Sequence, residues 1–291
     1  MNTFRYLQLD VFADRPGAGN PLGVVIEGER FDPARMQAFA AWTNLSETVF
    51  LLPPTTSDAD YSVRIFTPRQ ELPFAGHPSV GAAWAALDSG RVAAQKTALV
   101  QECAAGLLPV AITVVDGERK PQVRAPRARR IGGPELAPSL LDAASQNMRL
   151  GALERALWDN GPRWWLLELA DADAVRSLQP NLSAIAALTE ATGAVGLAVH
   201  ADDEGDGHHL AVRAFCPADG IPEDPVTGSA QAAIAARLDA VGRLPGRAGR
   251  YVGSQGREMG RDGRVEVWVD AAGDVWIGGS VQRAIVGELT W

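Results

Sequence analysis

One short pattern occurs twice in the chain, about half a chain apart, and it constrains the fold more than any other feature. The first copy is Arg-Ile-Phe-Thr-Pro at residues 64–68, followed by an Ala-rich apolar run that ends at Leu87. The second copy is Arg-Ala-Phe-Cys-Pro at residues 213–217, followed by a similar run to Leu238. The Arg, the Phe and the Pro recur at one constant offset. A repeat of this length indicates a duplicated unit rather than a solenoid of short repeats.

Each copy has the pattern of a strand, a loop and a helix. Residues 62–66 and 209–215 alternate with strand period, and the proline that follows each run ends the ladder because it has no N–H to donate. Gly76 and Gly228 permit either an unusual backbone angle or the close approach of a ligand. Two helix N-termini facing each other would form an anion-binding cleft between two half-molecules. The alternative interpretation is a pair of ordinary strand–helix junctions.

The composition is that of a globular protein, with 46% hydrophobic and 21% charged residues in a chain of 291, which is long enough for two domains. A net charge of −8 argues against a general nucleic-acid binder. Residues 1–5 lack the apolar core of a signal peptide, and no apolar run approaches the roughly 18 residues that a membrane span needs. Cys103 and Cys216 are the only cysteines, so we expect no zinc cluster and a cytoplasmic protein with reduced thiols.

Glu47 is an isolated carboxylate beside an apolar strand, in the stretch Asn-Leu-Ser-Glu-Thr at residues 44–48. Such a carboxylate either stays at the solvated end of the strand or is held in an apolar cleft with a raised pKa. The sequence alone leaves both alternatives open.

The acidic stretch at residues 202–209 ends in two adjacent histidines, so a metal site has to be considered there. Adjacent side chains at a strand end point in opposite directions, and no third ligand is apparent from the sequence. We therefore interpret this stretch as the turn of a solvated hairpin and predict no metal site.

Four motifs taken together resemble the PhzF family, the phenazine-biosynthesis isomerase and its relatives. They are Gly-Asn-Pro at 19–21, Asn-Leu-Ser-Glu-Thr at 44–48, the first repeat with Glu-Leu-Pro-Phe-Ala-Gly-His-Pro at 71–78, and Glu-Asp-Pro-Val-Thr-Gly-Ser-Ala at 223–230. Each motif is weak alone, but their order and separation are specific. The resemblance extends over nearly the whole chain.

The resemblance implies an α+β fold like that of diaminopimelate epimerase, with two pseudo-symmetric halves. Each half would be a curved, mostly antiparallel sheet around a central helix, expected at 78–87 and 228–238. We expect an N-terminal half over residues 1–117 and a C-terminal half over residues 118–291, with the final strand able to return to the first half. Related enzymes of this fold use a cysteine from each half. Here Ala75 and Asp224 stand at what the repeat offset makes equivalent points, which disfavours a two-thiol racemase.

The resemblance also implies the function: a cofactor-independent isomerase that moves a proton within a small unsaturated or cyclic carboxylated metabolite. Glu47 would be the acid and base in an interdomain cleft, with His77 and Asp224 as the other catalytic residues. Ser229 would bind the substrate, whose carboxylate would lie near Gly76 and Gly228. The resemblance implies a homodimer and no cofactor, and we expect neither nucleic acid nor membrane as a partner.

His77, Asp224 and Ser229 could instead have purely structural roles. His77 could simply make a local bond at the start of a helix, and Asp224 and Ser229 could be helix caps, for which Asp and Ser are favoured. At the level of function, the alternatives are an epimerase or racemase of the same fold and a non-catalytic small-molecule-binding protein.

Overall fold

The computed structural model describes residues 3–205 and 207–291, and their Cα positions divide the chain into two compact units. The first unit comprises residues 3–124 and 278–291, and the second comprises Ala125–Ile277. The hairpin that ends at Arg124 keeps residues 118–124 with the first unit, beyond the position 117 expected from sequence. The last strand of the chain belongs to the first unit because it pairs with the first strand. None of the described helices is long and apolar enough to span a membrane.

The first unit contains a sheet in the order β18-β1-β2-β3-β4-β6-β7-β8, with β5 paired to β4. Its elements are β1 (Thr3–Val11), β2 (Asn20–Val25), η1 (Gly28–Arg30), α1 (Pro33–Thr43), β3 (Glu47–Leu52), β4 (Tyr61–Phe66), β5 (Glu71–Leu72), α2 (Gly76–Asp88), β6 (Ala98–Cys103), β7 (Gly106–Val115), β8 (Glu118–Arg124) and β18 (Val281–Thr290). From β1 to β7, neighbouring strands pair antiparallel, parallel, antiparallel, parallel and antiparallel.

The second unit repeats this order of pairings along β10-β11-β12-β13-β15-β16, with β9 beside β10 and β14 beside β13. Its elements are β9 (Arg129–Gly132), η2 (Pro134–Leu136), α3 (Pro138–Ser145), β10 (Ala156–Asp159), β11 (Arg163–Glu168), α4 (Ala172–Arg176), α5 (Leu182–Thr192), β12 (Gly196–Gly205), β13 (His208–Cys216), η3 (Pro217–Asp219), β14 (Ile221–Asp224), α6 (Gly228–Ala240), β15 (Arg250–Gln255), η4 (Arg257–Met259), β16 (Gly263–Val269) and β17 (Val275–Gly278). The expected duplication is therefore present in the strand pairings.

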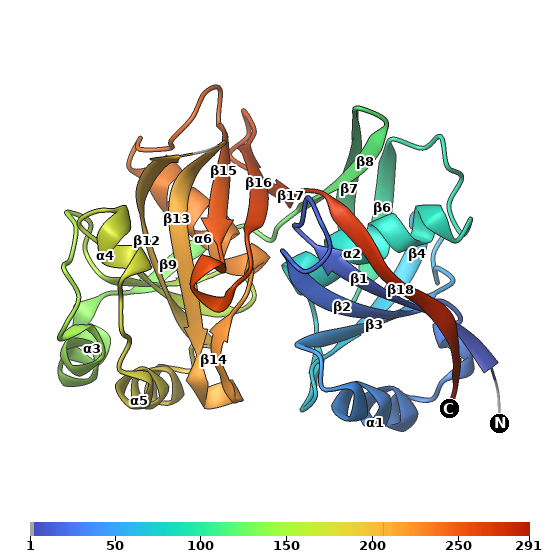
Figure 1. The fold of residues 1–291 in the computed structure, drawn as a ribbon, viewed down its shortest axis with the longest axis horizontal. Helices are drawn as coiled ribbons and strands as arrows, with labels where there is room; N and C mark the ends of the chain where they lie inside the picture. The colour runs from blue at the N-terminus through green and yellow to red at the C-terminus, as the bar shows by residue number, and fades with distance from the viewer. Residues whose placement is uncertain (1–2, 206) are drawn as a thin grey trace. The chain divides into compact units, whose positions relative to one another are not determined.

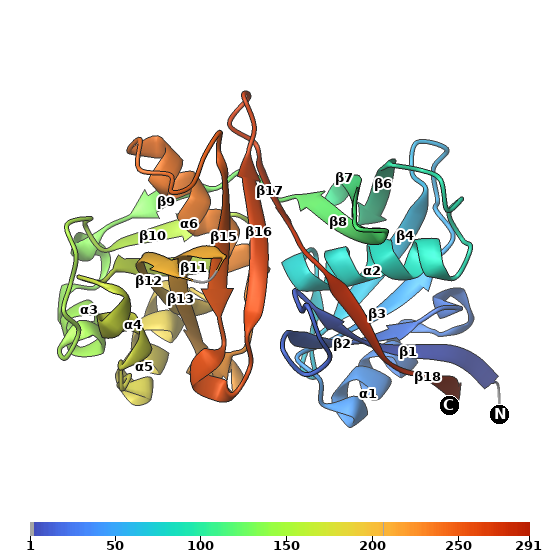
Figure 2. The same cartoon turned by 45° about the horizontal axis from the view of Figure 1, so that its top comes forward.

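Each unit has one helix at its centre, α2 in the first and α6 in the second, with strands around it (Figures 1 and 2). Their alanines explain this position, because a helix enclosed by a sheet has room only for small side chains. The four alanines at 82, 83, 85 and 86 are fully buried, and in α6 the alanines at 230, 232, 233 and 235 are 1% exposed or less. At Gly81 even a Cβ would lie 2.4 Å from Leu22 Cδ2. The predicted α+β class with a central helix in each half is confirmed.

The other helices cover the outer faces of the sheets, and α1 and α5 each begin at a side-chain cap. Asp32 caps α1 by accepting a hydrogen bond from Arg35 N at 2.9 Å, and α1 packs Phe39 against Phe31 and Phe50. Asn181 caps α5 in the same way, and α5 ends at Gly193 with φ of 63°. These local signals fix the helix ends because they satisfy free N–H groups or supply a left-handed residue.

The repeated Arg-x-Phe pattern builds the same local structure in both units. Arg64 donates two hydrogen bonds to Glu71, at 2.7 and 2.6 Å, and stacks over Phe66. Arg213 makes the same pair of bonds to Glu223, at 2.8 Å each, and stacks over Phe215. Each pair ties the strand before the loop to the short strand after it. The repeat thus preserves a bidentate ion pair as well as a strand.

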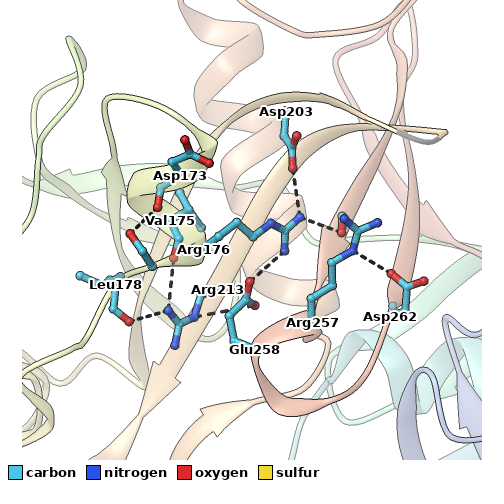
Figure 3. Close-up of polar contacts among 12 residues, drawn as sticks. Asp173, Val175, Arg176, Leu178, Asp203, Arg213, Arg257, Glu258 and Asp262 are labelled. Carbon is cyan, nitrogen blue, oxygen red and sulfur yellow. Dashed lines mark hydrogen bonds and ion pairs between the residues drawn. The ribbon is translucent and has the colours of Figure 1, made fainter.

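The Arg213–Glu223 pair is buried in a polar cluster of the second unit (Figure 3), whereas the Arg64–Glu71 pair is partly exposed. Arg213 Nη1 also donates to the backbone carbonyls of Val175 and Leu178, at 3.2 and 2.7 Å. Glu258 lies between Arg213 and Arg176, which in turn contacts Asp203. The cluster joins α4, β12, β13 and η4 within the second unit.

The acidic stretch at 202–209 is the end of an antiparallel hairpin in the described residues, as predicted, but its strands extend further than the sequence indicates. β12 continues to Gly205 and β13 begins at His208, with Asp202 opposite Leu210. His208 Nε2 lies 2.9 Å from Asp203 Oδ2, whereas His209 Nδ1 accepts from Val252 N at 3.1 Å. Position 206 lies outside the described residues. The antiparallel β12–β13 ladder therefore extends to the pair Gly205 and His208.

Candidate active site

Glu47 is the first residue of β3, and the turn before it is set by local signals. α1 ends at Thr43, and Asn44 follows in the left-handed conformation with φ of 53°. Two residues later the Ser46 hydroxyl donates to Asn20 Oδ1 at 3.0 Å. The parallel pairing of β2 with β3 places Glu47 opposite Leu22. Glu47 is therefore held where a helix–strand turn meets the start of a buried strand, and its side chain is 16% exposed.

Asn20 is itself positioned by a buried carboxylate, that of Asp10. Asp10 Oδ2 accepts hydrogen bonds from Gly17 N at 2.6 Å and Gly19 N at 3.1 Å, which closes the turn before β2. Only glycine fits at position 19, because a Cβ there would lie 2.1 Å from the carbonyl oxygen of Val11. The Gly-Asn-Pro motif thus supports the turn that carries Glu47, through Asn20 and Ser46.

His77 lies in the first turn of α2 and is brought to Glu47 by the packing of α2 against β3. The distance from His77 Nε2 to Glu47 Oε2 is 3.4 Å. Burial of the imidazole lowers the pKa of His77 from 6.5 to about 3, so the ring is neutral near neutral pH. The contact is thus one between a neutral imidazole and a carboxyl group rather than an ion pair. A local bond at the start of the helix does not account for this geometry.

The neutral state of His77 has a consequence for acid stability, which His200 shares. Burial, with a smaller contribution from Arg237, lowers the pKa of His200 to about 3 as well. Between pH 6.5 and about 3 the unfolded chain binds protons at these positions that the folded chain does not. We expect the free energy of unfolding to fall as pH falls through this window, and this contribution to be constant above it.

Nuclear magnetic resonance of the histidine side chains tests this expectation directly. The imidazole of His77 should remain neutral in the folded protein at about pH 5, whereas it should be protonated in the urea-unfolded chain. A His77 resonance that titrates near 6.5 in the folded protein would contradict the burial argument. His77→Gln should flatten the pH dependence of unfolding in part, because His200 remains.

In the second unit, Asp224 is the last residue of β14 and is anchored by the residues that follow it. Asp224 Oδ2 accepts from Thr227 Oγ1 at 2.5 Å. Gln255, fully buried on β15, donates to the Asp224 carbonyl at 3.0 Å and accepts from Thr227 N at 3.1 Å. This amide therefore holds both ends of the loop between Asp224 and α6.

Ser229 lies in the first turn of α6, as His77 does in α2. Its hydroxyl oxygen accepts from the indole N–H of Trp164 at 3.1 Å, and its carbonyl accepts from Asn160 at 2.9 Å. Because the indole can only donate, the hydroxyl proton of Ser229 can still be donated to another group. Ser229 is 8% exposed, so any partner for that proton must approach closely.

The starts of the two central helices correct three details of the sequence interpretation. Thr227 is the N-cap of α6, so neither Asp224 nor Ser229 is a cap, and no side chain caps α6 or α2. Ala75 is the N-cap of α2, which makes Thr227, and not Asp224, its counterpart. The shift arises because η3 adds a turn to the second copy. Gly76 and Gly228 also lack positive φ, so an unusual backbone angle is not the reason for glycine there.

One known protein family matches nearly the whole sequence, including all the site residues described above. The profile of the family described as phenazine biosynthesis-like protein, PhzC-PhzF, matches residues 9–282, which include Glu47, His77, Asp224 and Ser229. The chain belongs to the PhzF family.

The PhzF chain is similar in sequence to curated proteins, several of which are named as isomerases. It is 34% identical over 245 residues to the trans-2,3-dihydro-3-hydroxyanthranilate isomerase of Pseudomonas aeruginosa, covering 83% of this chain and 82% of the relative. It is also 32% identical over 252 residues to antisense-enhancing sequence 1 of Schizosaccharomyces pombe, covering 84% and 83% of the two chains. The expectation of an enzyme of the PhzF-like isomerase family is confirmed at the level of the family.

Solved structures agree with the PhzF fold. The Bacillus anthracis phenazine biosynthesis protein of the PhzF family is 26% identical, with a TM-score of 0.85 over the full length of both chains. A probable proline racemase from Agrobacterium radiobacter is 17% identical with a TM-score of 0.67, covering 99% of this chain and 93% of that one. At this identity, the similarity to the proline racemase is evidence only for a shared fold.

The structure adds positioning residues that sequence reasoning missed in this PhzF chain. Asn20 belongs to a motif that the sequence singled out, but its bond to Ser46 had no sequence signal. Gln255 and Trp164 lie on distant strands, so nothing in their local sequence connects them with Asp224 or Ser229. Within the described residues, no three potential metal-ligating side chains form a cluster.

Proposed function

We propose that this protein is a cofactor-independent isomerase that moves a proton within a small unsaturated or cyclic carboxylated metabolite. Glu47 acts as the acid and base in this proposal. The observation that carries it is the 3.4 Å contact between Glu47 Oε2 and Nε2 of the buried, neutral His77, and both residues lie within the range that the family profile matches.

The proposed reaction needs one proton and no external reactant. Glu47, as the carboxylate, removes a proton from a carbon next to a conjugated system, and the electron pair of the broken C–H bond enters that system. The carboxylic acid so formed then returns the proton to another carbon, which forms a new C–H bond and restores the carboxylate. One group can serve in both steps when its surroundings exclude most water, and the Glu47 side chain is only 16% exposed.

His77 supports this chemistry as an uncharged neighbour. A neutral imidazole can orient the carboxyl group by a hydrogen bond without stabilising its ionised form as strongly as an imidazolium would. With a proton on Nε2, the ring donates toward Glu47 Oε2, and it can share the transferred proton while substrate is bound.

The second unit supplies the polar groups that we propose for substrate recognition. Ser229 retains a hydroxyl proton to donate, and Asp224 is fixed by Thr227 and Gln255 to accept a hydrogen bond. The free N–H groups at the starts of α2 and α6 suit a substrate carboxylate, because no side chain caps either helix. The acid named in the Pseudomonas aeruginosa relative, trans-2,3-dihydro-3-hydroxyanthranilate, is the first compound to test.

The experiment is to incubate the protein with this acid, and with a panel of small unsaturated cyclic acids, in deuterated water. Nuclear magnetic resonance should show a double-bond isomer that carries solvent deuterium at the newly protonated carbon, to an extent set by how fast Glu47 exchanges. Exchange at one stereocentre with scrambled configuration would instead indicate an epimerase. Tight binding of the acid without turnover or exchange would overturn the catalytic proposal.

Asp224→Asn tests whether both units act on the same substrate molecule. We expect kcat/KM to fall about 100-fold, because an amide can donate where a carboxylate can only accept and the substrate is misplaced. If Asp224 and Glu47 serve one reaction, the double variant Glu47→Gln/Asp224→Asn should lose much less than the product of the single losses. Strictly multiplicative losses would contradict a shared substrate. Thr227→Val, which removes the hydroxyl that donates to Asp224 Oδ2 and accepts from Gln255 Nε2 but keeps the Asp224 carboxylate, should cost less.

A further inference from the structure

The central helix of the first unit, α2, is covered everywhere except along one short stripe. Its residues 76–88 are all buried apart from Trp84 and Asp88, which lie one turn apart and therefore share a face. The helix otherwise fits inside the sheet with mostly small side chains, so the tryptophan is an exception in it. A large indole on the uncovered stripe is either a plug that closes a gap or one wall of a binding site.

The gap lies between the two ends of the first unit's sheet. β18 and β8 are the first and last strands in the order of that sheet, and both pack against α2 (Figure 2). The pocket there has a volume of about 550 Å³, within the range of small-molecule sites. It is lined by Trp84 and Asp88 of α2, by residues 117–119 of the β7–β8 turn and by residues 281–283 of β18. None of these residues belongs to the candidate active site, and Trp84 lies about 10 Å along α2 from His77.

Two arginines extend toward the pocket from the inner side of the sheet. Arg119 shares a face of β8 with the fully buried Val123, because alternate residues of a strand point the same way. On the other side of the pocket, Arg283 of β18 lies opposite Leu9 of β1. Leu9 faces α2, because a Cβ at Gly81 would lie 3.6 Å from its Cδ1. Both guanidinium groups are therefore on the sides of their strands that face the helix.

The two arginines differ in what they already bind. Arg283 Nη1 lies 3.4 Å from Asp88 Oδ1, and Arg5 Nη2 lies 3.2 Å from the other oxygen of this carboxylate. Across residues 3–205 and 207–291, the side chain of Arg119 has no ion pair and no hydrogen bond, although it lines the pocket. A guanidinium carries five N–H donors in a planar fork that matches a carboxylate. Arg119 is therefore available to bind an anion.

Trp84 and the acidic residues narrow the class of that anion. In the part of the chain that the structure describes, no aromatic ring or cationic side chain stacks on the Trp84 indole, so a planar group can stack there. Asp88 and Glu118 line the same pocket, and their charges would repel a dianion such as a phosphate more than a monoanion. The lining thus suits a planar group that carries one negative charge.

We propose that this pocket binds a planar aromatic carboxylate, with its ring on Trp84 and its carboxylate on Arg119. A plug would need only the indole and would not account for the unpaired guanidinium beside it. The ring alone or the charge alone satisfies only half of the site. The inference concerns a pocket outside the candidate active site and does not rest on the proposed function.

Titration with 2-naphthoate, followed by nuclear magnetic resonance of the tryptophan indole N–H groups, tests the proposal. The Trp84 resonance, assigned by its loss in Trp84→Leu, should shift with a Kd of about 1 mM or lower, a strength that a ligand of this size can reach. 2-Naphthamide keeps the ring without the charge and acetate keeps the charge without the ring, so each should bind at least about tenfold more weakly. 2-Naphthyl phosphate should bind no more tightly than 2-naphthoate, and tighter binding would overturn the assignment to carboxylates.

Arg119→Gln removes the proposed carboxylate contact and should weaken 2-naphthoate binding at least about tenfold, because charge-assisted hydrogen bonds are lost. Since Arg119 has no partner within the described fold, the same substitution should leave the free energy of unfolding nearly unchanged. Arg129→Gln is the matched control, because Arg129 is an exposed arginine of the second unit that likewise has no ion pair among the described residues. It should bind 2-naphthoate as the unchanged protein does.

Glu47→Gln distinguishes this pocket from the candidate active site and should leave the affinity for 2-naphthoate unchanged. Loss of binding in Glu47→Gln would place the compound at the active site and overturn the proposal. An unshifted Trp84 resonance, or equal binding by Arg119→Gln, would show that Trp84 only closes a gap in the sheet, and the proposal would be wrong.

Discussion

Replacing Glu47 with Gln is expected to lower the rate of substrate isomerisation by about 10² to 10⁴-fold, the usual contribution of a positioned acid–base group. Gln keeps the shape of Glu and can still contact His77, but its amide cannot take up a proton from carbon. The loss should appear in kcat, because the substitution removes the chemical step and leaves the groups proposed for binding in place. Product formation and solvent deuterium uptake, followed together by nuclear magnetic resonance, measure it.

Glu29→Gln is the control for this prediction. Glu29 lies on η1 in the same unit, paired with Arg91 at the surface, so the same change of charge should leave the rate unaltered. If the rate of Glu47→Gln stays within about tenfold of the unchanged protein, Glu47 is not the base. Glu47→Asp retains the carboxyl group but moves it away from His77. Its isomerisation rate should therefore lie between the rates of Glu47→Gln and of the unchanged protein.

Arg213→Met is expected to destabilise the protein by about 3–5 kcal/mol, the cost typical of removing one partner from a buried ion pair. The change would leave Glu223, whose side chain is 13% exposed, without the guanidinium that now binds both its oxygens. It would also remove the hydrogen bonds to the carbonyls of Val175 and Leu178. Urea unfolding followed by circular dichroism measures the difference.

The duplication itself supplies the control for Arg213. Arg64→Met breaks the equivalent pair in the first unit, but Arg64 and Glu71 are 29% and 35% exposed, so water solvates the remaining carboxylate. Its loss should therefore cost about 1 kcal/mol or less. Equal destabilisation by the two variants would show that the difference in burial has no energetic consequence and would contradict the argument.

Much of the fold could be predicted from the sequence because its signals are local. The strand periodicity before Pro68 and Pro217 reappears as β4 and β13, and the Ala-rich run after each proline reappears as α2 and α6. The hairpin at 202–209 has longer strands than the sequence predicts, because polar residues at the end of a strand resemble a loop when the partner strand is unknown.

The candidate site was predictable only in part. The motif around Glu47 and His77 identified both residues, but the contact between them depends on α2 packing against β3, which no local pattern encodes. Gln255 and Trp164 were missed for the same reason, since each reaches Asp224 or Ser229 from a distant strand. A positioning residue can be recognised only in the folded structure. In the sequence, an amide or indole side chain that will be buried beside the site cannot be told from one buried elsewhere in the core.

The sequence by itself determined that the chain is duplicated and that each copy is a strand, a loop and an Ala-rich helix, whereas the central position of these helices was implied by the family resemblance. These features follow from periodicity, side-chain volume and capping, which act over a few residues. Only the tertiary structure decided that Thr227 is the N-cap residue of α6, that Glu47 contacts a neutral His77, and that β18 pairs with β1. These depend on burial and on pairings between distant segments, which arise only when the whole sheet is assembled.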